Sequence, residues 1–142
     1  MINGYKVILV TGSRNWNSVE SVAKEMSKYP FGTIFVHGYA DGADLCCHLV
    51  AKELGFGVLP NPAHWNHSCK RWKEVYGPCP KSCREYVGRA AGPIRNRKML
   101  KLYGDILDGA LAFHEDLKNS KGTKDMVKIL EKAGIHVDIF NK

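Results

Sequence analysis

Short apolar runs alternate along this chain with longer segments in which apolar residues recur at helical spacing. An uninterrupted apolar run rich in β-branched residues is typical of a strand that is buried on both faces. Apolar residues three or four positions apart predict a helix that covers such a strand. The runs that predict strands are 5–10, 33–36, 57–59, 106–113 and 135–140.

Residues typical of helix starts and ends stand between these runs. Asn17 and Thr123 are expected to cap helices, and Pro93 suits the first position of another. Gly55 and Gly134 are placed to end two of them. The apolar positions expected to face the core are Val19, Val22, Ala23, Met26, Cys46, Leu49, Val50, Leu54, Met126, Val127, Leu130 and Ala133.

Strands that alternate with helices predict βαβ units, and therefore a parallel sheet with helices on both faces. We expect an α/β, Rossmann-like fold in a single domain over residues 1–142. Residues 66–87 interrupt the alternation with aromatic, basic and cysteine residues and two prolines. This stretch is too short to hold a core of its own, so we interpret it as an insertion.

Length and composition indicate the size of the core and the cellular compartment. A chain of 142 residues is long enough to bury a substantial core. It contains an odd number of cysteines, five, and Cys46 and Cys47 are adjacent in a helical pattern, which favours a reducing, cytoplasmic compartment over a disulfide framework. We expect no secretory signal and no membrane span, because no apolar run is long enough.

The net charge of +7 is concentrated in one region. Residues 66–101 hold ten lysines or arginines against Glu74 and Glu85, so the remaining residues sum to about neutrality. This region is a candidate surface for anions such as phosphates or nucleic acid. A solvated basic face that only keeps the protein soluble is the alternative.

Four loops that follow predicted strands and precede predicted helices carry glycine beside polar or charged residues. In parallel sheets such loops gather at the carboxyl ends of the strands, where ligands bind. Backbone N–H groups there can hold a phosphate, and arginine adds a bidentate fork. The candidate ligand-binding residues are Thr11, Gly12, Ser13, Arg14, Gly38, Gly42, Asp44, Gly92, Arg95, Asn96, Gly122 and Thr123.

Each of these motifs also has a purely structural interpretation. The stretch 11–14 could be an ordinary turn, and Asp41 or Asp44 could cap a helix and offset its dipole. Arg95 is different, because a cation in the first turn of a helix opposes the macrodipole. We therefore expect Arg95 to have a negative partner, with phosphate as the first candidate.

The insertion holds a second candidate site. His67, Cys69, Cys79 and Cys83 could bind a structural zinc ion and so stabilise a segment that lacks a core. Unrelated free thiols are the alternative. Trp65, Trp72, Tyr76 and Tyr86 stand among basic residues, where they could stack the bases of a single nucleic-acid strand or pack the insertion against the domain.

Five motifs in order resemble the YspA/YpsA-related branch of the SLOG superfamily. They are Val10–Arg14, His37–Asp44, Ala63-x-Trp65, Gly88–Met99 and Gly122–Met126, and the likeness runs from about residue 7 to 137 outside the insertion. The resemblance implies a Rossmann-like sheet that binds a nucleotide or a nucleotide-derived ligand.

The resemblance also bears on chemistry. Related phosphoribohydrolases carry an R-K-x-x-M block, to which Arg95-Asn96-x-x-Met99 is similar with Asn in place of Lys. Their P-G-G-x-G-T-x-x-E loop is altered here, since Met126 stands where the last glutamate would be. Asp44 and Asp125 are therefore the candidate catalytic carboxylates.

These observations lead to one predicted function and one alternative. The protein is expected to bind a phosphorylated nucleotide or an ADP-ribose-like nucleotide-sugar, and hydrolysis of an N-glycosidic bond is the reaction to test. A nucleic-acid-binding module that uses the basic, aromatic insertion is the alternative. Self-association would be unsurprising in this fold.

Overall fold

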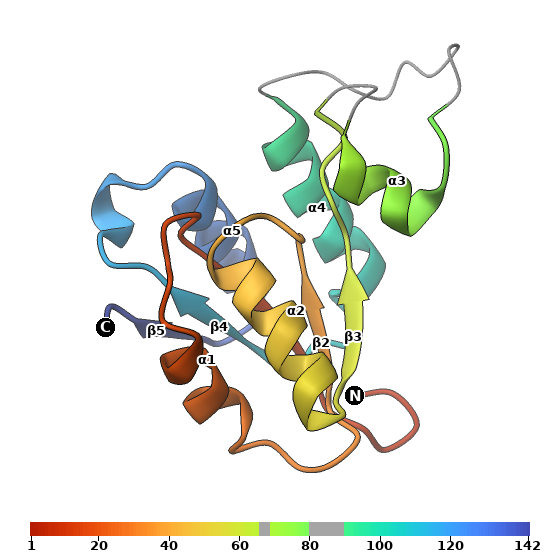
Figure 1. Ribbon diagram of the computed structural model, residues 1–142. Coiled ribbons are helices and arrows are strands. Elements are labelled where there is room, and N and C mark those ends of the chain that lie inside the picture. The colour runs from red at the N-terminus through yellow and green to blue at the C-terminus, as the bar shows by residue number, and fades with distance from the viewer. Residues whose placement is uncertain (66–68, 80–89) are drawn as a thin grey trace.

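The computed structural model describes residues 1–65, 69–79 and 90–142. The described residues form a five-stranded sheet of order β3-β2-β1-β4-β5 in which all neighbouring strands are parallel (Figure 1). The elements are β1 (Val7–Gly12), α1 (Val19–Met26), β2 (Ile34–His37), α2 (Ala43–Leu54), β3 (Gly57–Pro60), α3 (Lys70–Tyr76), α4 (Ala91–Tyr103), β4 (Gly109–Phe113), the 3-10 turn η2 (Leu117–Asn119), α5 (Gly122–Lys132) and β5 (Val137–Phe140).

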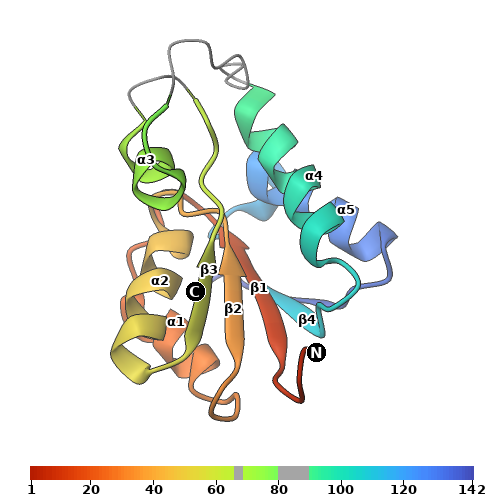
Figure 2. The same ribbon diagram turned by 90° about the vertical axis from the view of Figure 1, so that its right-hand side faces the viewer.

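Helices cover both faces of this sheet, and Figure 2 shows α1 and α2 on one side of the strands and α4 and α5 on the other. The core on the α1 and α2 side includes Val10 and Phe35, whereas the core on the α4 and α5 side includes Leu9 and Leu130. Because successive strand residues point to opposite faces, both faces of β1 are apolar. The predicted Rossmann-like α/β class is confirmed.

The chain order creates a switch point between β1 and β4, at the carboxyl ends of the strands. From β1 the chain moves outward through β2 to β3, and it then crosses back to β4 on the other side of β1. The loops that follow β1 and β4 therefore diverge above the sheet, which is where parallel α/β folds bind ligands. Helix α3 and the start of α4 lie beyond the carboxyl ends of the strands (Figures 1 and 2).

Several predicted boundaries were wrong by a few residues. The first strand begins later and runs through Gly12, which pairs with Phe113 of β4, so Thr11 and Gly12 belong to the strand and not to a turn. The predicted strand 106–113 begins only at Gly109, because residues 104–108 form the connection after α4.

Three predicted helix starts were also wrong. Helix α1 is capped by Ser18, whose hydroxyl accepts from the N–H of Ser21, and not by Asn17. Pro93 lies at the third position of α4, which is still within the first turn, where its missing N–H costs no hydrogen bond. Thr123 caps nothing, and the Ser120 hydroxyl instead accepts from the N–H of Lys124.

The buried face of α2 differs from the prediction. Leu49 and Leu54 are exposed, while Cys47 and Ala51 are buried with Val50. Small residues let α2 lie close to the sheet, and the larger leucines face outward. The predicted left-handed ends at Gly55 and Gly134 are confirmed by their positive φ angles.

Candidate functional site

The loop after β1 is held by close contacts that only glycine allows. A Cβ on Gly12 would lie 2.2 Å from the carbonyl oxygen of Phe113, and one on Gly42 would lie 2.0 Å from that of Ser13. Gly42 also has a φ of 79°. The Ser13 carbonyl accepts from the N–H of Ala43, so the backbone of this loop caps α2. Two predicted ligand glycines thus serve the packing of β1 against α2.

Ser13 is buried and its hydrogen bonds are made within the chain. Its hydroxyl accepts from the N–H of Asn15 and donates to Glu115, which follows β4. The side chain therefore ties the loops after β1 and β4 together. Arg14, the next residue, is exposed, and its guanidinium lies 5.0 Å from the ring centroid of Trp65.

The second glycine loop folds over a buried carboxyl group. Asp44, in the first turn of α2, is 5% exposed, and it accepts backbone hydrogen bonds from Ala40 and Gly38. Its Oδ1 atom is buried and unpaired within the described residues. Burial raises the pKa of Asp44 to about 6, although the nearby Arg95 guanidinium works against that shift.

Beneath the same loop lies a pair of buried histidines. Burial, and then His48, lower the pKa of His37 to about 3, so its ring is neutral. Its Nδ1 accepts from the N–H of Tyr39, which places the proton on Nε2, 3.0 Å from Nδ1 of His48. Tyr39 stacks on His48 and has a positive φ of 51°. These rings form a fixed base for the loop 38–42.

Arg95 reaches across from α4 to this loop. Its Nη1 donates to the carbonyl oxygen of Gly38 at 2.6 Å and to that of Asn61 at 3.4 Å, and its Nε donates to Asn96. A Cβ on Gly38 would lie 2.4 Å from Nη1, so a larger residue there would displace the Arg95 guanidinium. The predicted negative partner is thus replaced, for these atoms, by neutral carbonyl and amide oxygens, and Nη2 makes no hydrogen bond to any described residue.

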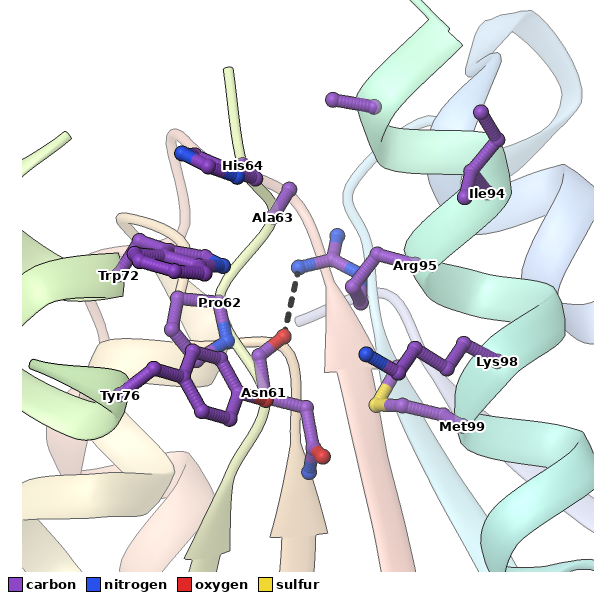
Figure 3. Close-up of a pocket in the computed structure, with 11 residues that line it drawn as sticks. Asn61, Pro62, Ala63, His64, Trp72, Tyr76, Ile94, Arg95, Lys98 and Met99 are labelled. Atoms are coloured by element: carbon purple, nitrogen blue, oxygen red, sulfur yellow. Dashed lines mark hydrogen bonds between the residues drawn. The ribbon is translucent and has the colours of Figure 1, made fainter. Parts of the chain in front are cut away.

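Two cavities meet at Arg95. The first, of about 330 Å³, lies between α3 and α4 and is shown in Figure 3. We call it the aromatic cavity, and its lining includes Trp72, Tyr76, Ile94, Lys98, Met99, His64, Asn61 and Arg95. The second, of about 260 Å³, lies over the loop 38–41. We call it the arginine cavity, and its lining includes Arg14, Gly38, Tyr39, Ala40, Asp41, Trp65, Lys70, Arg71 and Arg95.

The arginine cavity carries an excess of positive charge. Arg71 is neutralised by Asp41, with their atoms 2.7 Å apart, and it also donates to the Tyr39 carbonyl. Arg14 and Lys70 have no acidic partner within the described part of the chain. With Arg95 they form a concave, basic surface whose lining includes the carboxylate of Asp41, and the buried Asp44 carboxyl group interacts electrostatically with Arg95.

Helix α3 belongs to the predicted insertion, and polar contacts fix it over the second loop. Besides the Arg71 contacts, Glu74 accepts from the Tyr39 hydroxyl at 2.8 Å. None of its residues is fully buried. Helix α3 supplies one wall of each cavity.

The fourth predicted loop lies apart from the cavities. Asn96 donates to the Gly122 carbonyl at 3.4 Å and so links α4 to the start of α5. Gly122 is exposed, Thr123 is buried, and neither lines either cavity. Gly92 packs against the Trp65 ring. The structure brings together Arg14, Gly38 and Arg95 at one cavity, and the loop before α5 does not line that cavity.

The two predicted catalytic carboxylates do not share a cavity. Asp44 belongs to α2 and Asp125 to α5, on opposite faces of the sheet. Asp125 pairs with Arg97 at 3.5 Å, and its Oδ2 is buried without a partner in the described ranges. Neither residue lines the aromatic or the arginine cavity.

The predicted zinc ligands are only partly described. His67 and Cys83 lie outside the described residues. Cys69 donates to the Ala63 carbonyl, and Cys79 lies 3.3 Å from Nε2 of His64. Within 1–65, 69–79 and 90–142 no three His, Cys, Asp or Glu side chains form a metal-binding group. The zinc site stays a prediction.

Sequence reasoning missed several residues that build the cavities. Asn61 accepts from the Tyr103 hydroxyl and joins β2 and β3 through its amide, and Arg71 and Lys98 line the cavity walls. The position of Asn61 directly after the third strand was a usable signal, because it is equivalent to the positions of Ser13 and Gly38. No pattern indicated which cations of the basic region face inward.

Comparison with solved structures identifies the fold class of the chain. The chain superimposes on DNA processing protein A (DprA) from Streptococcus pneumoniae with a TM-score of 0.65 and 18% sequence identity. The match covers 95% of this chain and 50% of that one, so the chain spans about half the length of DprA. The fold of this chain is the Rossmann-like α/β fold that it shares with DprA. No model of a protein family matches the sequence.

The family follows from a sequence relative. The chain is 32% identical over 142 residues to Gene 61 protein of Mycobacterium phage D29, and the alignment covers 94% of this chain and 94% of the phage protein. This chain belongs to the family of that phage protein. No helix within the described ranges combines the length and apolar character needed to cross a bilayer.

Proposed function

We propose that this protein binds a phosphorylated nucleotide or nucleotide-sugar across the two cavities that meet at Arg95. The observation that carries the proposal is the position of Arg95, which lines both a basic cavity and an aromatic one. A nucleotide has the complementary halves, because it joins an anionic phosphate to a flat, heteroaromatic base.

The phosphate belongs in the arginine cavity. Arg14 and Lys70 lack acidic partners among the described residues. Nη2 of Arg95 donates no hydrogen bond to any described residue. Phosphate oxygens are the acceptors that guanidinium forks bind best. The backbone N–H groups of Tyr39 and Ala40 already donate to His37 and Asp44, so side chains rather than loop amides would hold the phosphate.

The base belongs in the aromatic cavity. Tyr76, Ile94 and Met99 supply apolar walls, and the two cavities together reach the size range of small-molecule sites. The YspA/YpsA-related branch suggested by the five motifs is part of this proposal, since that resemblance implies a nucleotide-derived ligand.

Hydrolysis of an N-glycosidic bond remains a further part of the proposal. A carboxyl group with a pKa near 6 suits proton transfer at neutral pH, which favours Asp44 over Asp125. Its free oxygen is covered by the loop 38–40, so this chemistry would require that loop to move. Chromatography of nucleotides incubated with the protein, and with Asp44→Asn, would detect released base.

Calorimetric titration with nucleoside 5′-monophosphates tests the binding proposal. We expect Arg14→Ala and Arg95→Ala each to weaken binding about tenfold or more, because each loses a charge-assisted contact. Arg14 is exposed, so its variant should fold normally. Lys101→Ala, on the exposed side of α4, is the control and should bind like the unchanged protein. Equal affinities in all four proteins would overturn the proposal.

A single nucleic-acid strand is the second candidate ligand. The fold is shared with a DNA processing protein, and Trp65 lies beside the Arg14 guanidinium, an arrangement also found in grooves that stack bases. Salt dependence separates the two candidates. Binding of an oligonucleotide through several phosphates should weaken steeply as salt rises, whereas binding of a mononucleotide should change far less.

A further inference from the structure

The polar side chains that face the aromatic cavity are not evenly divided between donors and acceptors. Lys98 Nζ and the indole N–H of Trp72 point into it, as does the Arg95 guanidinium (Figure 3). Lys98 lies 5.9 Å from the Tyr76 ring centroid and, like the Trp72 indole N–H, it donates no hydrogen bond to any residue that the structure describes.

The nearby acceptors are already in use. Asn61 Oδ1 accepts from the Tyr103 hydroxyl, and the Asn61 carbonyl accepts from Arg95. The Ala63 carbonyl accepts from Cys69. The Tyr76 hydroxyl can both donate and accept, whereas the Lys98 ammonium and the Trp72 indole N–H are donors that no acceptor of the described residues takes up. A ligand group that presents acceptors would satisfy them.

The shape of the walls favours a flat ring over a second phosphate. Pro62, Tyr76, Ile94 and Met99 offer apolar surface around the donors, and one face of Trp72 is already stacked on His64 at 3.9 Å. The Trp72 ring therefore presents its edge, with the N–H, to the cavity. An anion would leave the apolar walls without a partner, while a base would cover them.

We infer that the aromatic cavity recognises the keto edge of a purine, with O6 and N7 of guanine or hypoxanthine accepting hydrogen bonds from Lys98 and Trp72. This inference rests on the proposed nucleotide site. Lysine and arginine pair with O6 and N7 in the same way when proteins read guanine in DNA. Adenine carries an amino group at position 6, which would set a donor against these donors.

Calorimetry with inosine, guanosine and adenosine 5′-monophosphates tests this inference. Inosine and adenosine monophosphates share their phosphate and sugar and differ at position 6. We expect the two keto nucleotides to bind about tenfold more tightly than adenosine monophosphate. Lys98→Met should remove most of that preference, and Trp72→Phe, which keeps a ring but loses the N–H, should reduce it. Lys101→Met is the matched control and should retain it.

The possible outcomes distinguish failure of the keto preference from failure of the proposed nucleotide site. Arg14-dependent binding of all three nucleotides with equal affinity would overturn the keto preference and leave the nucleotide site standing. An equal loss for all three in Lys98→Met would show a phosphate contact and would also overturn it. Tighter binding of nucleoside 3′,5′-bisphosphates regardless of base would do the same. No binding of any nucleotide would overturn both.

Discussion

Asp44 is a buried carboxyl group, and one of its oxygens has no hydrogen-bond partner among the described residues. Its pKa of about 6 lies above the ordinary 3.8 because burial disfavours the charged form. The folded protein therefore binds the Asp44 proton more tightly than the unfolded chain does between about pH 4 and pH 6. This contribution to stability is present at low pH and is lost as the pH rises through 6, a change of about 3 kcal/mol.

Replacing Asp44 with asparagine should remove that dependence. Relative to the unchanged protein, Asp44→Asn should gain about 2–3 kcal/mol of unfolding free energy on going from pH 4 to pH 7.5. Urea unfolding of both proteins at several pH values measures the difference. A difference that stays constant with pH would contradict the assignment of the raised pKa to Asp44.

The other residues of the site divide into those that sequence could find and those it could not. Arg95 was found because a predicted helix start at Pro93 places a cation in the first turn, although α4 begins at Ala91 and Arg95 is its fifth residue. Arg71 and Lys98 were missed as site residues because a basic stretch does not reveal which side chains face inward, and for Trp72 the sequence left base stacking and packing as alternatives. The docking of α3 on the loop 38–41, through Glu74 and Arg71, turns that face of the insertion toward the cavities.

At the scale of elements, the glycine loops have two different roles. Gly12 and Gly42 permit β1, β4 and α2 to approach closely, whereas a Cβ on Gly122 would meet no atom within 4 Å. The sequence motifs looked alike because both kinds place glycine before a helix. Distinguishing them requires knowledge of what packs against each loop.

Alanine substitutions should separate the two roles. Gly42→Ala should destabilise the protein by about 3 kcal/mol or more, since it combines a positive φ with a backbone clash. Gly122→Ala should be neutral or stabilising by about 0.5 kcal/mol. Thermal and urea unfolding measure both, and comparable losses in the two variants would refute this division.

The ends of the strands and the buried faces of the helices also depend on packing that the sequence does not reveal. The parallel α/β class followed from alternation alone, but the ends of β1 and β4 depend on their mutual pairing at Gly12 and Phe113. The buried face of α2 was misassigned because Leu49 is more apolar than Cys47, while the close approach to the sheet selects the smaller side chain.

At the scale of the whole molecule, the described part of the insertion, residues 69–79, joins the domain through polar and aromatic contacts, and no residue of α3 is fully buried. A structural zinc ion, as predicted from His67, Cys69, Cys79 and Cys83, would supply the missing stabilisation. Elemental analysis should then find about one zinc per chain. Cys69→Ser and Cys79→Ser should lose the metal, and Cys46→Ser should keep it. A metal-free protein whose melting temperature a chelator does not change would end the zinc hypothesis.

The chain as a whole is a Rossmann-like parallel sheet whose carboxyl-end loops, with α3 and α4, enclose two adjoining cavities around one arginine. Their combination predicts a single ligand with an anionic end over the loop 38–41 and a flat end against α4. The fold alone does not determine the ligand, because functions are carried by sites.

A crystal structure of the protein with inosine 5′-monophosphate tests this account most directly. We expect the phosphate to contact Arg14 and Arg95 in the arginine cavity and the base to lie between Tyr76 and Lys98. A nucleotide bound elsewhere on the surface, or no bound nucleotide at saturating concentration, would contradict it.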